Sequence, residues 1–154
     1  MPRGKRNRDI HMLNKFLARV GIAFFCCAVI PVAHGKPCTP KDAEAADEVV
    51  DHLDSWKKVD AARMQFGHCD DGSIAEGNSE AVARLLVDQW NTLPALAGLI
   101  KAHPALKRFV LRHIDSTLNT DDLKKIEALA SSSCQQDLLE LCADLKKAAT
   151  QAGK

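Results

Sequence analysis

Residues 39–67, TPKDAEAADEVVDHLDSWKKVDAARMQFG, carry the pattern that decides the fold class of this chain. Apolar side chains recur there at spacings of three and four residues, which places them on one face of a helix. The residues on this face are Ala46, Val49, Val50, Leu53, Trp56 and Val59. Thr39 has the position of an N-cap, with Pro40 as the first helical residue and Asp42 in the first turn. We therefore expect one unbroken amphipathic helix of about 25 residues that ends near Gly67.

The chain beyond this stretch repeats the helical pattern in shorter segments. One helix is expected to start at Ser73 or at Ser79, since Ser73 and Glu76 have the spacing of a capping box. Four further helices are expected in the segments 92–102, 104–114, 120–130 and 138–149. No segment alternates apolar and polar residues as a half-buried strand does. The sequence therefore predicts an all-α bundle of five or six helices, stabilised by disulfides and forming one domain over residues 36–154.

Residues 1–35 have the three parts of a secretory signal peptide. A basic start is followed by an uncharged apolar run over residues 20–32, and Ala33-His34-Gly35 places small residues at a cleavage site before Lys36. A membrane-spanning helix needs about 20 apolar residues, and this run is shorter. A start at Met12 would give a leader of the usual length, and an uncleaved membrane anchor is the alternative interpretation. We expect export, with no membrane attachment after cleavage.

Cleavage at this site would leave a mildly acidic chain, in which acidic residues outnumber Lys and Arg by four. Nucleic-acid binding proteins carry clustered positive charge instead, so no nucleic-acid partner is expected. The remaining cysteines are Cys38, Cys69, Cys134 and Cys142. An even number of cysteines in a small exported domain indicates a disulfide framework.

Helix length restricts how these cysteines pair. A straight helix over residues 40–66 would separate its ends by about 40 Å, whereas the two Cα atoms of a disulfide lie within about 7 Å. A Cys38–Cys69 bond would therefore require this helix to break and fold back. Cys134 and Cys142 flank a short turn between two predicted helices, and we favour that pair. Cys38 and Cys69 are then either unpaired or joined across a broken helix; with a straight helix, each would instead pair with a C-terminal cysteine.

The segment Gly67–Gly77 is the most polar loop between two predicted helices, and it contains three acids and a histidine. Such loops often carry function. We expect a binding surface here that meets the basic cleft of one protein partner. The residues expected in this surface are Asp70, Asp71, Glu76, Glu80 and Trp90. The alternative is that Asp70 and Asp71 only make turn and cap hydrogen bonds.

The patterns of catalytic and metal sites are weak in this sequence. His68, Cys69 and the neighbouring acids lack the ligand spacing of a calcium loop or a zinc site, so no metal and no cofactor are predicted. Neither the Gly-x-Ser-x-Gly motif nor the His-Glu-x-x-His motif occurs. His113 lies on an apolar stripe, where a hydrogen-bonded core histidine is the expected role, and His103 is expected to cap a helix. The sequence therefore predicts a protein that is not an enzyme.

Two runs resemble a family of small exported proteins of Gram-negative bacteria that have no assigned activity. They are CDDGSIAEGNSEAVARLLVDQW, residues 69–90, and LKRFVLRHID, residues 106–115. The resemblance implies export to the periplasm or the exterior of a Gram-negative cell and a helical fold, but no chemistry. We predict a small periplasmic binding or inhibitory protein without catalytic activity, similar in build to immunity proteins. The alternatives are an envelope-stress or structural protein without a specific ligand, and a small metal-dependent hydrolase that uses the segment His68–Glu80.

Overall fold

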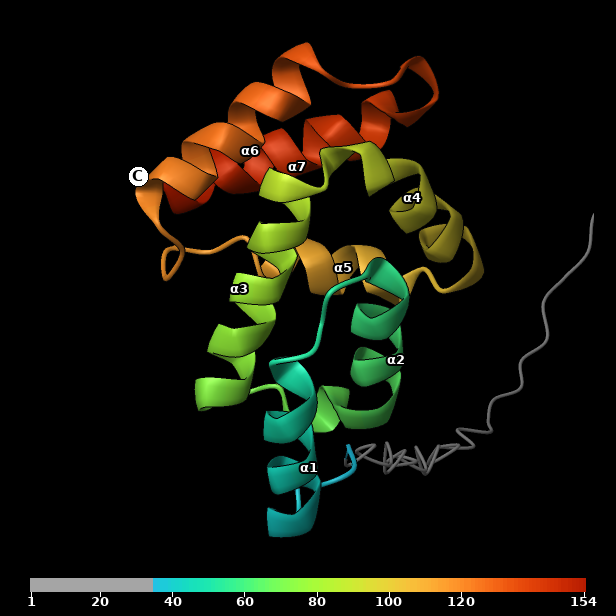
Figure 1. Ribbon diagram of the computed structural model, residues 1–154, viewed down its shortest axis with the longest axis vertical. Helices are drawn as coiled ribbons and strands as arrows, with labels where there is room; N and C mark the ends of the chain where they lie inside the picture. Colours follow the sequence, from blue (N-terminus) through green and yellow to red (C-terminus); the bar gives the residue numbers. More distant parts are fainter. Residues whose placement is uncertain (1–34) are drawn as a thin grey trace, which may run out of the picture. The chain divides into compact units, whose positions relative to one another are not determined.

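All regular structure in residues 35–154, which a computed structural model describes, is helical (Figure 1). The seven α-helices of this part are α1 (Pro40–Val50), α2 (Trp56–Phe66), α3 (Gly72–Asp88), α4 (Leu93–Ala102), α5 (Ala105–Arg112), α6 (Thr120–Ser132) and α7 (Leu139–Ala152). Three short 3₁₀ turns connect some of them: η1 (Gly67–Cys69), η2 (Trp90–Thr92) and η3 (Gln136–Leu138). The all-α prediction is confirmed. The signal peptide predicted for residues 1–35 lies outside the described residues, apart from Gly35.

The first predicted helix is in fact two helices, which is why residues 35–154 contain seven α-helices and not five or six. α1 ends at Val50, with Asp51 as its C-cap, and Ser55 before α2 has an extended backbone with φ −155° and ψ 152°. The prediction of one unbroken helix was wrong because apolar spacing continues through the break. Leu53 within it and Trp56 after it are both buried. The Asp and Ser side chains of residues 51–55 favour turns and caps over a helix interior.

This break decides the disulfide pairing. It turns the chain back, so that Cys38 before α1 and Cys69 in η1 bond to each other with a Cα–Cα distance of 4.9 Å. Cys134 and Cys142 form the second disulfide, as predicted, with a Cα–Cα distance of 6.2 Å across the turn before α7. The sequence left open whether Cys38 and Cys69 are unpaired, bonded to each other or bonded to the C-terminal cysteines. In the structure they are bonded to each other across the broken helix.

The helix starts show which capping signals act. Thr39 caps α1 as predicted, and its Oγ1 accepts a hydrogen bond from the Asp42 backbone N–H at 3.1 Å. α3 starts earlier than either predicted serine, because Asp71 is its N-cap and accepts from the Gly72 N–H at 2.8 Å. Gly72 has φ +53°, a backbone conformation that glycine adopts without a steric penalty. α6 starts at Thr120, but its cap is the preceding residue, Asn119.

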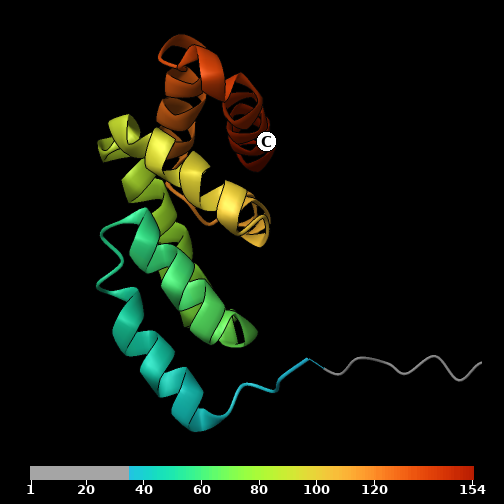
Figure 2. The same ribbon diagram turned by 90° about the vertical axis from the view of Figure 1, so that its right-hand side faces the viewer.

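α3 is the central element of the core. It packs against α1 at one end and α6 at the other, while α6 and α7 lie side by side (Figure 1, Figure 2). Trp56 is buried as expected and donates a hydrogen bond from Nε1 to Thr92 Oγ1 at 2.9 Å. The largest fully buried side chains are Leu53, Leu85, Leu86, Leu93, Leu96, Leu106, Ile126 and Leu145. This core leaves the opposite face of α3 free to line a surface groove.

Candidate functional site

A groove of about 740 Å³ lies along the exposed face of α3, opposite the loop that joins α5 to α6. Its carboxylates are Glu76, Glu80, Asp88 and Asp122, and its one cationic side chain is Arg84. The α3 members recur every four residues, and this spacing places them on one face of the helix. The remaining lining residues are Ala83, Val87, Thr117, Leu118 and Asn119. The groove is therefore acidic, with a few apolar side chains in its lining.

Most of this negative charge is not neutralised within the described part of the chain. Asp88 has a long ion pair with Lys125, at 3.7 Å, while none of the ion pairs within residues 35–154 uses Glu76, Glu80 or Asp122. The Arg84 guanidinium donates to the Leu53 carbonyl, at 3.5 Å. A cationic ligand would therefore meet carboxylates that hold no cationic partner among these residues.

The structure separates the five residues of the predicted binding surface. Glu76 and Glu80 line the groove. Asp71 is exposed but is bonded to the start of α3 as its N-cap. The Asp70 side chain is only 3% exposed, and Trp90 is half-buried with its Nε1 donating to the Ser133 carbonyl at 3.0 Å. The structure therefore does not bring the five residues to one surface: Asp70 is buried in internal bonds, and Trp90 lies outside the groove.

Three charged residues of the groove, Arg84, Asp88 and Asp122, were not predicted from the sequence. Arg84 and Asp88 continue the four-residue spacing of Glu76 and Glu80, so a count along α3 would have found them. Asp122 lies on another helix and is brought to the groove only by packing. No sequence signal assigns it to the same site.

A buried polar cluster lies at one end of the groove. Asp70 accepts from Asn78 Nδ2 at 2.9 Å, contacts His113 Nε2 at 3.1 Å and is also bonded to Arg112. His113 is 2% exposed, and its Nδ1 lies 2.9 Å from Ser79 Oγ. Both ring nitrogens therefore have partners, which agrees with the core histidine expected from the sequence.

Asp115 extends this cluster to the α5–α6 loop. Its Oδ2 lies 3.0 Å from Ser79 Oγ, and its Oδ1 accepts from the Thr117 N–H at 2.8 Å and the Thr117 hydroxyl at 2.6 Å. A small cavity of about 220 Å³ reaches the cluster and shares Glu76 and Thr117 with the groove. The loop wall of the groove is thus connected to α3 through Asp115 and Ser79.

The environment shifts two pKa values in this cluster. Burial, with Arg112 nearby, lowers the pKa of His113 to about 4, so its imidazole is neutral at pH 7. Burial opposes ionisation of Asp115, but the hydrogen bonds from the Thr117 hydroxyl and backbone N–H outweigh it and lower the pKa of this carboxyl. At neutral pH the cluster therefore holds a neutral histidine and an ionised Asp115.

Ser79, His113 and Asp70 are the side-chain types of a nucleophilic triad, in the order that such a triad uses. Two features oppose this chemistry. The Ser79 hydroxyl also lies 3.0 Å from the Ala75 carbonyl and 3.0 Å from Asp115 Oδ2, so acceptors other than His113 compete for its proton. Ser79 also lies inside α3, where backbone N–H groups bond along the helix instead of facing a developing oxyanion. The arrangement suits a structural hydrogen-bond network better.

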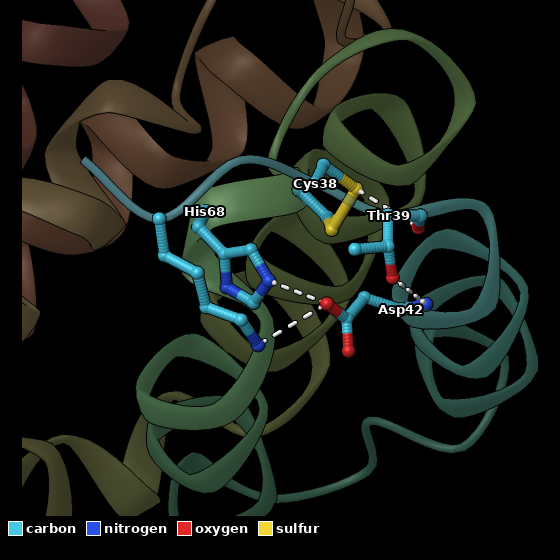
Figure 3. Close-up of a disulfide and its surroundings, with 6 residues drawn as sticks. Cys38, Thr39, Asp42 and His68 are labelled. Carbon is cyan, nitrogen blue, oxygen red and sulfur yellow. Dashed lines mark hydrogen bonds and ion pairs between the residues drawn. A yellow bond between two sulfur atoms is a disulfide. The ribbon is translucent and has the colours of Figure 1, made fainter. Parts of the chain in front are cut away.

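The residues near the first disulfide form a separate polar group (Figure 3). His68 Nε2 lies 3.2 Å from Asp42 Oδ2, and Lys36 Nζ lies 3.1 Å from the same oxygen. Hydrogen bonds from His68 and then from Lys36 lower the pKa of Asp42 to about 2. With Cys69 in the disulfide, these contacts tie the start of α1 to η1. Within residues 35–154, no three His, Cys, Asp or Glu side chains are arranged to hold a metal ion.

Comparisons with models of protein families, with curated proteins and with solved structures give no match. The resemblance to small exported proteins therefore stays a prediction. Among the described residues, no helix is long and apolar enough to cross a membrane. The feature of these residues that points to a function is the acidic groove along α3.

Proposed function

We propose that this chain is an exported binding or inhibitory protein without catalytic activity, and that its α3 groove holds a basic segment of one protein partner. One observation carries the proposal: the groove contains the carboxylates of Glu76, Glu80 and Asp122, and no ion pair of the described residues uses them. Complementary charge of this kind steers association and rejects wrong partners.

The apolar residues of the groove lining support a basic protein segment over a bare cation. Lys and Arg side chains pack their aliphatic stems on apolar surface while their charged ends reach polar groups. Val87, which is half-buried, and Leu118 line the same groove as the carboxylates. Glu76 and Glu80 are one turn apart, about 6 Å along the helix axis. Alternate side chains of an extended segment are spaced about 7 Å apart, so two basic residues could meet this pair.

Export is part of the proposal. Two disulfides in a small chain are typical of proteins that fold in an oxidising compartment such as the periplasm. The signal-like pattern of residues 1–35 supports the same location. Similarity in build to immunity proteins supports an inhibitory role only by analogy.

A charge-reversal experiment tests the groove. Immobilised chain 36–154 is incubated with an extract of exported proteins from the source cells, and bound proteins are eluted with a salt gradient. The variant E76K/E80K reverses the groove pair. The variant E44K/E48K is the matched control, because both residues are exposed on α1 and also four residues apart.

The proposal expects one stoichiometric protein that binds the wild type and the control variant, elutes with salt and is lost from E76K/E80K. Equal capture by all three proteins would show that the groove is not the binding surface. Capture of no protein would favour the alternative of an envelope or structural protein without a specific ligand.

A second candidate function is hydrolysis with Ser79 as the nucleophile, which differs from the metal-dependent hydrolase expected from the sequence and is favoured by the Ser79–His113–Asp70 order. It requires Ser79 to react as a nucleophile. Labelling with a fluorophosphonate probe, followed by mass mapping, tests this requirement. Because of the competing acceptors around Ser79, we expect no adduct on this residue.

A further inference from the structure

Four buried or half-buried side chains form one continuous chain of contacts beside the groove. Asp70 meets His113 Nε2 at 3.1 Å, His113 Nδ1 meets Ser79 Oγ at 2.9 Å, and Ser79 Oγ meets Asp115 Oδ2 at 3.0 Å. Each contact joins two electronegative atoms at hydrogen-bond distance. Each therefore needs one proton between its two atoms.

The number of protons available depends on His113. A neutral imidazole brings one proton and the Ser79 hydroxyl brings one, while the Asp115 carboxylate and the Asp70 carboxylate, which accepts from Arg112 and Asn78, bring none. The neutral form therefore supplies two protons for three contacts. An imidazolium brings two protons, so the protonated form supplies one for every contact.

The geometry also decides which contact is left without a proton in the neutral form. His113 Nε2 faces the Asp70 carboxylate and has to carry the ring proton, so Nδ1 is an acceptor. Nδ1 is buried with Ser79 as its neighbour, whereas Asp115 is only half-buried and keeps its bonds from Thr117. Leaving the buried acceptor unpaired is the costlier choice. In the neutral form the Ser79 hydroxyl therefore donates to His113.

We propose that this chain is a one-proton switch, in which proton uptake turns the Ser79 hydroxyl from His113 to Asp115 and fastens the α5–α6 loop to α3. In the protonated form, His113 Nδ1–H donates to Ser79 Oγ, and the Ser79 O–H donates to Asp115 Oδ2. The Ala75 carbonyl, 3.0 Å from Ser79 Oγ, competes for this hydroxyl in both forms. The ionised Asp115 is the stronger acceptor, because it bears charge.

Charged groups from every neighbouring element act on the proton. Asp70, which precedes α3, and Asp115 in the loop favour it, and Glu76 of α3 lines the same small cavity. Arg112 of α5 opposes it, as does burial of the ring, while the Phe109 ring packed on His113 is uncharged. Burial and Arg112 place the midpoint well below neutral, at a pKa of about 4 for His113. The switch therefore acts in acid solution.

The consequence for the groove rests on the proposed function, whereas the switch itself does not. Thr117, Leu118 and Asn119 of the loop form one wall of the groove. This wall has one more hydrogen bond to α3 in the protonated form than in the neutral form. A basic segment in the groove would thus contact a loop that can move at neutral pH and a loop that is hydrogen-bonded to α3 in acid.

Solution NMR of chain 36–154 alone tests the switch without any partner. The His113 ring nitrogens and the Thr117 amide are followed from pH 7.5 to pH 3, because the Thr117 N–H donates directly to Asp115. We expect Nδ1 to gain a proton with the same midpoint at which the Thr117 amide shifts. The protection factor of this amide should rise about tenfold, as expected for one added charge-assisted hydrogen bond.

Two variants separate the switch from ordinary titration of the groove acids. S79A removes the hydroxyl, so His113 should still titrate while the Thr117 amide no longer follows it. H113Q removes the titrating ring, so the Thr117 shift at the His113 midpoint should disappear. The proposal would be overturned if the Thr117 amide shift keeps its wild-type midpoint in H113Q. It would also be overturned if this amide still shifts together with His113 in S79A. Amide spectra at pH 7 establish that each variant is folded, and either variant alone decides the outcome.

Discussion

Gly77→Ala is the substitution for which the structure gives the clearest expected magnitude. A Cβ atom at this position in α3 would lie 2.1 Å from Val50 Cγ1 of α1. Carbon atoms in contact are ordinarily about 3.5–4.0 Å apart, so Val50 or the whole of α1 would have to move by about 1.5 Å. Val has one strongly preferred rotamer in a helix, which makes a side-chain rotation alone costly.

Two opposing terms set the change in the free energy of unfolding. Overpacking of a core contact costs about 1–3 kcal/mol, whereas replacing glycine by alanine inside a helix gains about 1 kcal/mol. We therefore expect Gly77→Ala to destabilise the protein by up to about 2 kcal/mol net. Gly98→Ala in α4 is the matched control, because a Cβ there would meet nothing within 4 Å. It should gain up to about 1 kcal/mol.

Urea unfolding followed by far-UV circular dichroism measures both variants, and the double variant G77A/V50A tests the cause. Val50→Ala removes the clashing methyl group, so the double variant should be more stable than the sum of the two single effects by about 1 kcal/mol or more. If Gly77→Ala stabilises the protein as Gly98→Ala does, or if the double variant shows no coupling, the α1–α3 contact is not as close as described.

The remaining predictions concern pH and the disulfides. The unfolded chain takes up a proton on His113 near pH 6.5, whereas the native protein does so only near pH 4. The free energy of unfolding should therefore fall by up to about 3 kcal/mol as the pH decreases across this window. Urea midpoints measured at each pH test this, and H113Q should show a flatter profile. Loss of the Cys38–Cys69 bond in C38S/C69S should cost about 3–4 kcal/mol, because it closes a loop with a sequence separation of 31. Loss of the Cys134–Cys142 bond should cost about 1 kcal/mol less, because its sequence separation is only 8 residues. Equal urea midpoints for the two disulfide variants would contradict this argument from loop entropy.

Local signals in the sequence were enough for much of the fold. Apolar spacing of three and four residues predicted the helices, because that periodicity follows from helix geometry alone. The Thr39 cap and the Cys134–Cys142 bond were also correct, and both depend on residues close together in the chain. The break at residues 51–55 was missed, because a bend that keeps Leu53 and Trp56 buried preserves the same periodicity.

The residues of the candidate site also differ in how far the sequence predicted them. Glu76 and Glu80 share a face of α3 by their spacing, so their place in a common surface was predictable from the chain. The burial of Asp70 and the position of Asp122 in the groove were not predictable from the chain, because each depends on packing against a helix that is distant in sequence.

Sequence patterns alone thus specify helices, caps and the short disulfide, because these interactions lie within a few residues of each other. Only tertiary packing joins Asp70, Ser79, His113 and Asp115 into one hydrogen-bonded chain, as their contacts span 34 to 43 residues. Such contacts are set by how α3, α5 and the loop after α5 settle around the shared core. The groove and its proton chain are therefore properties of the packed molecule.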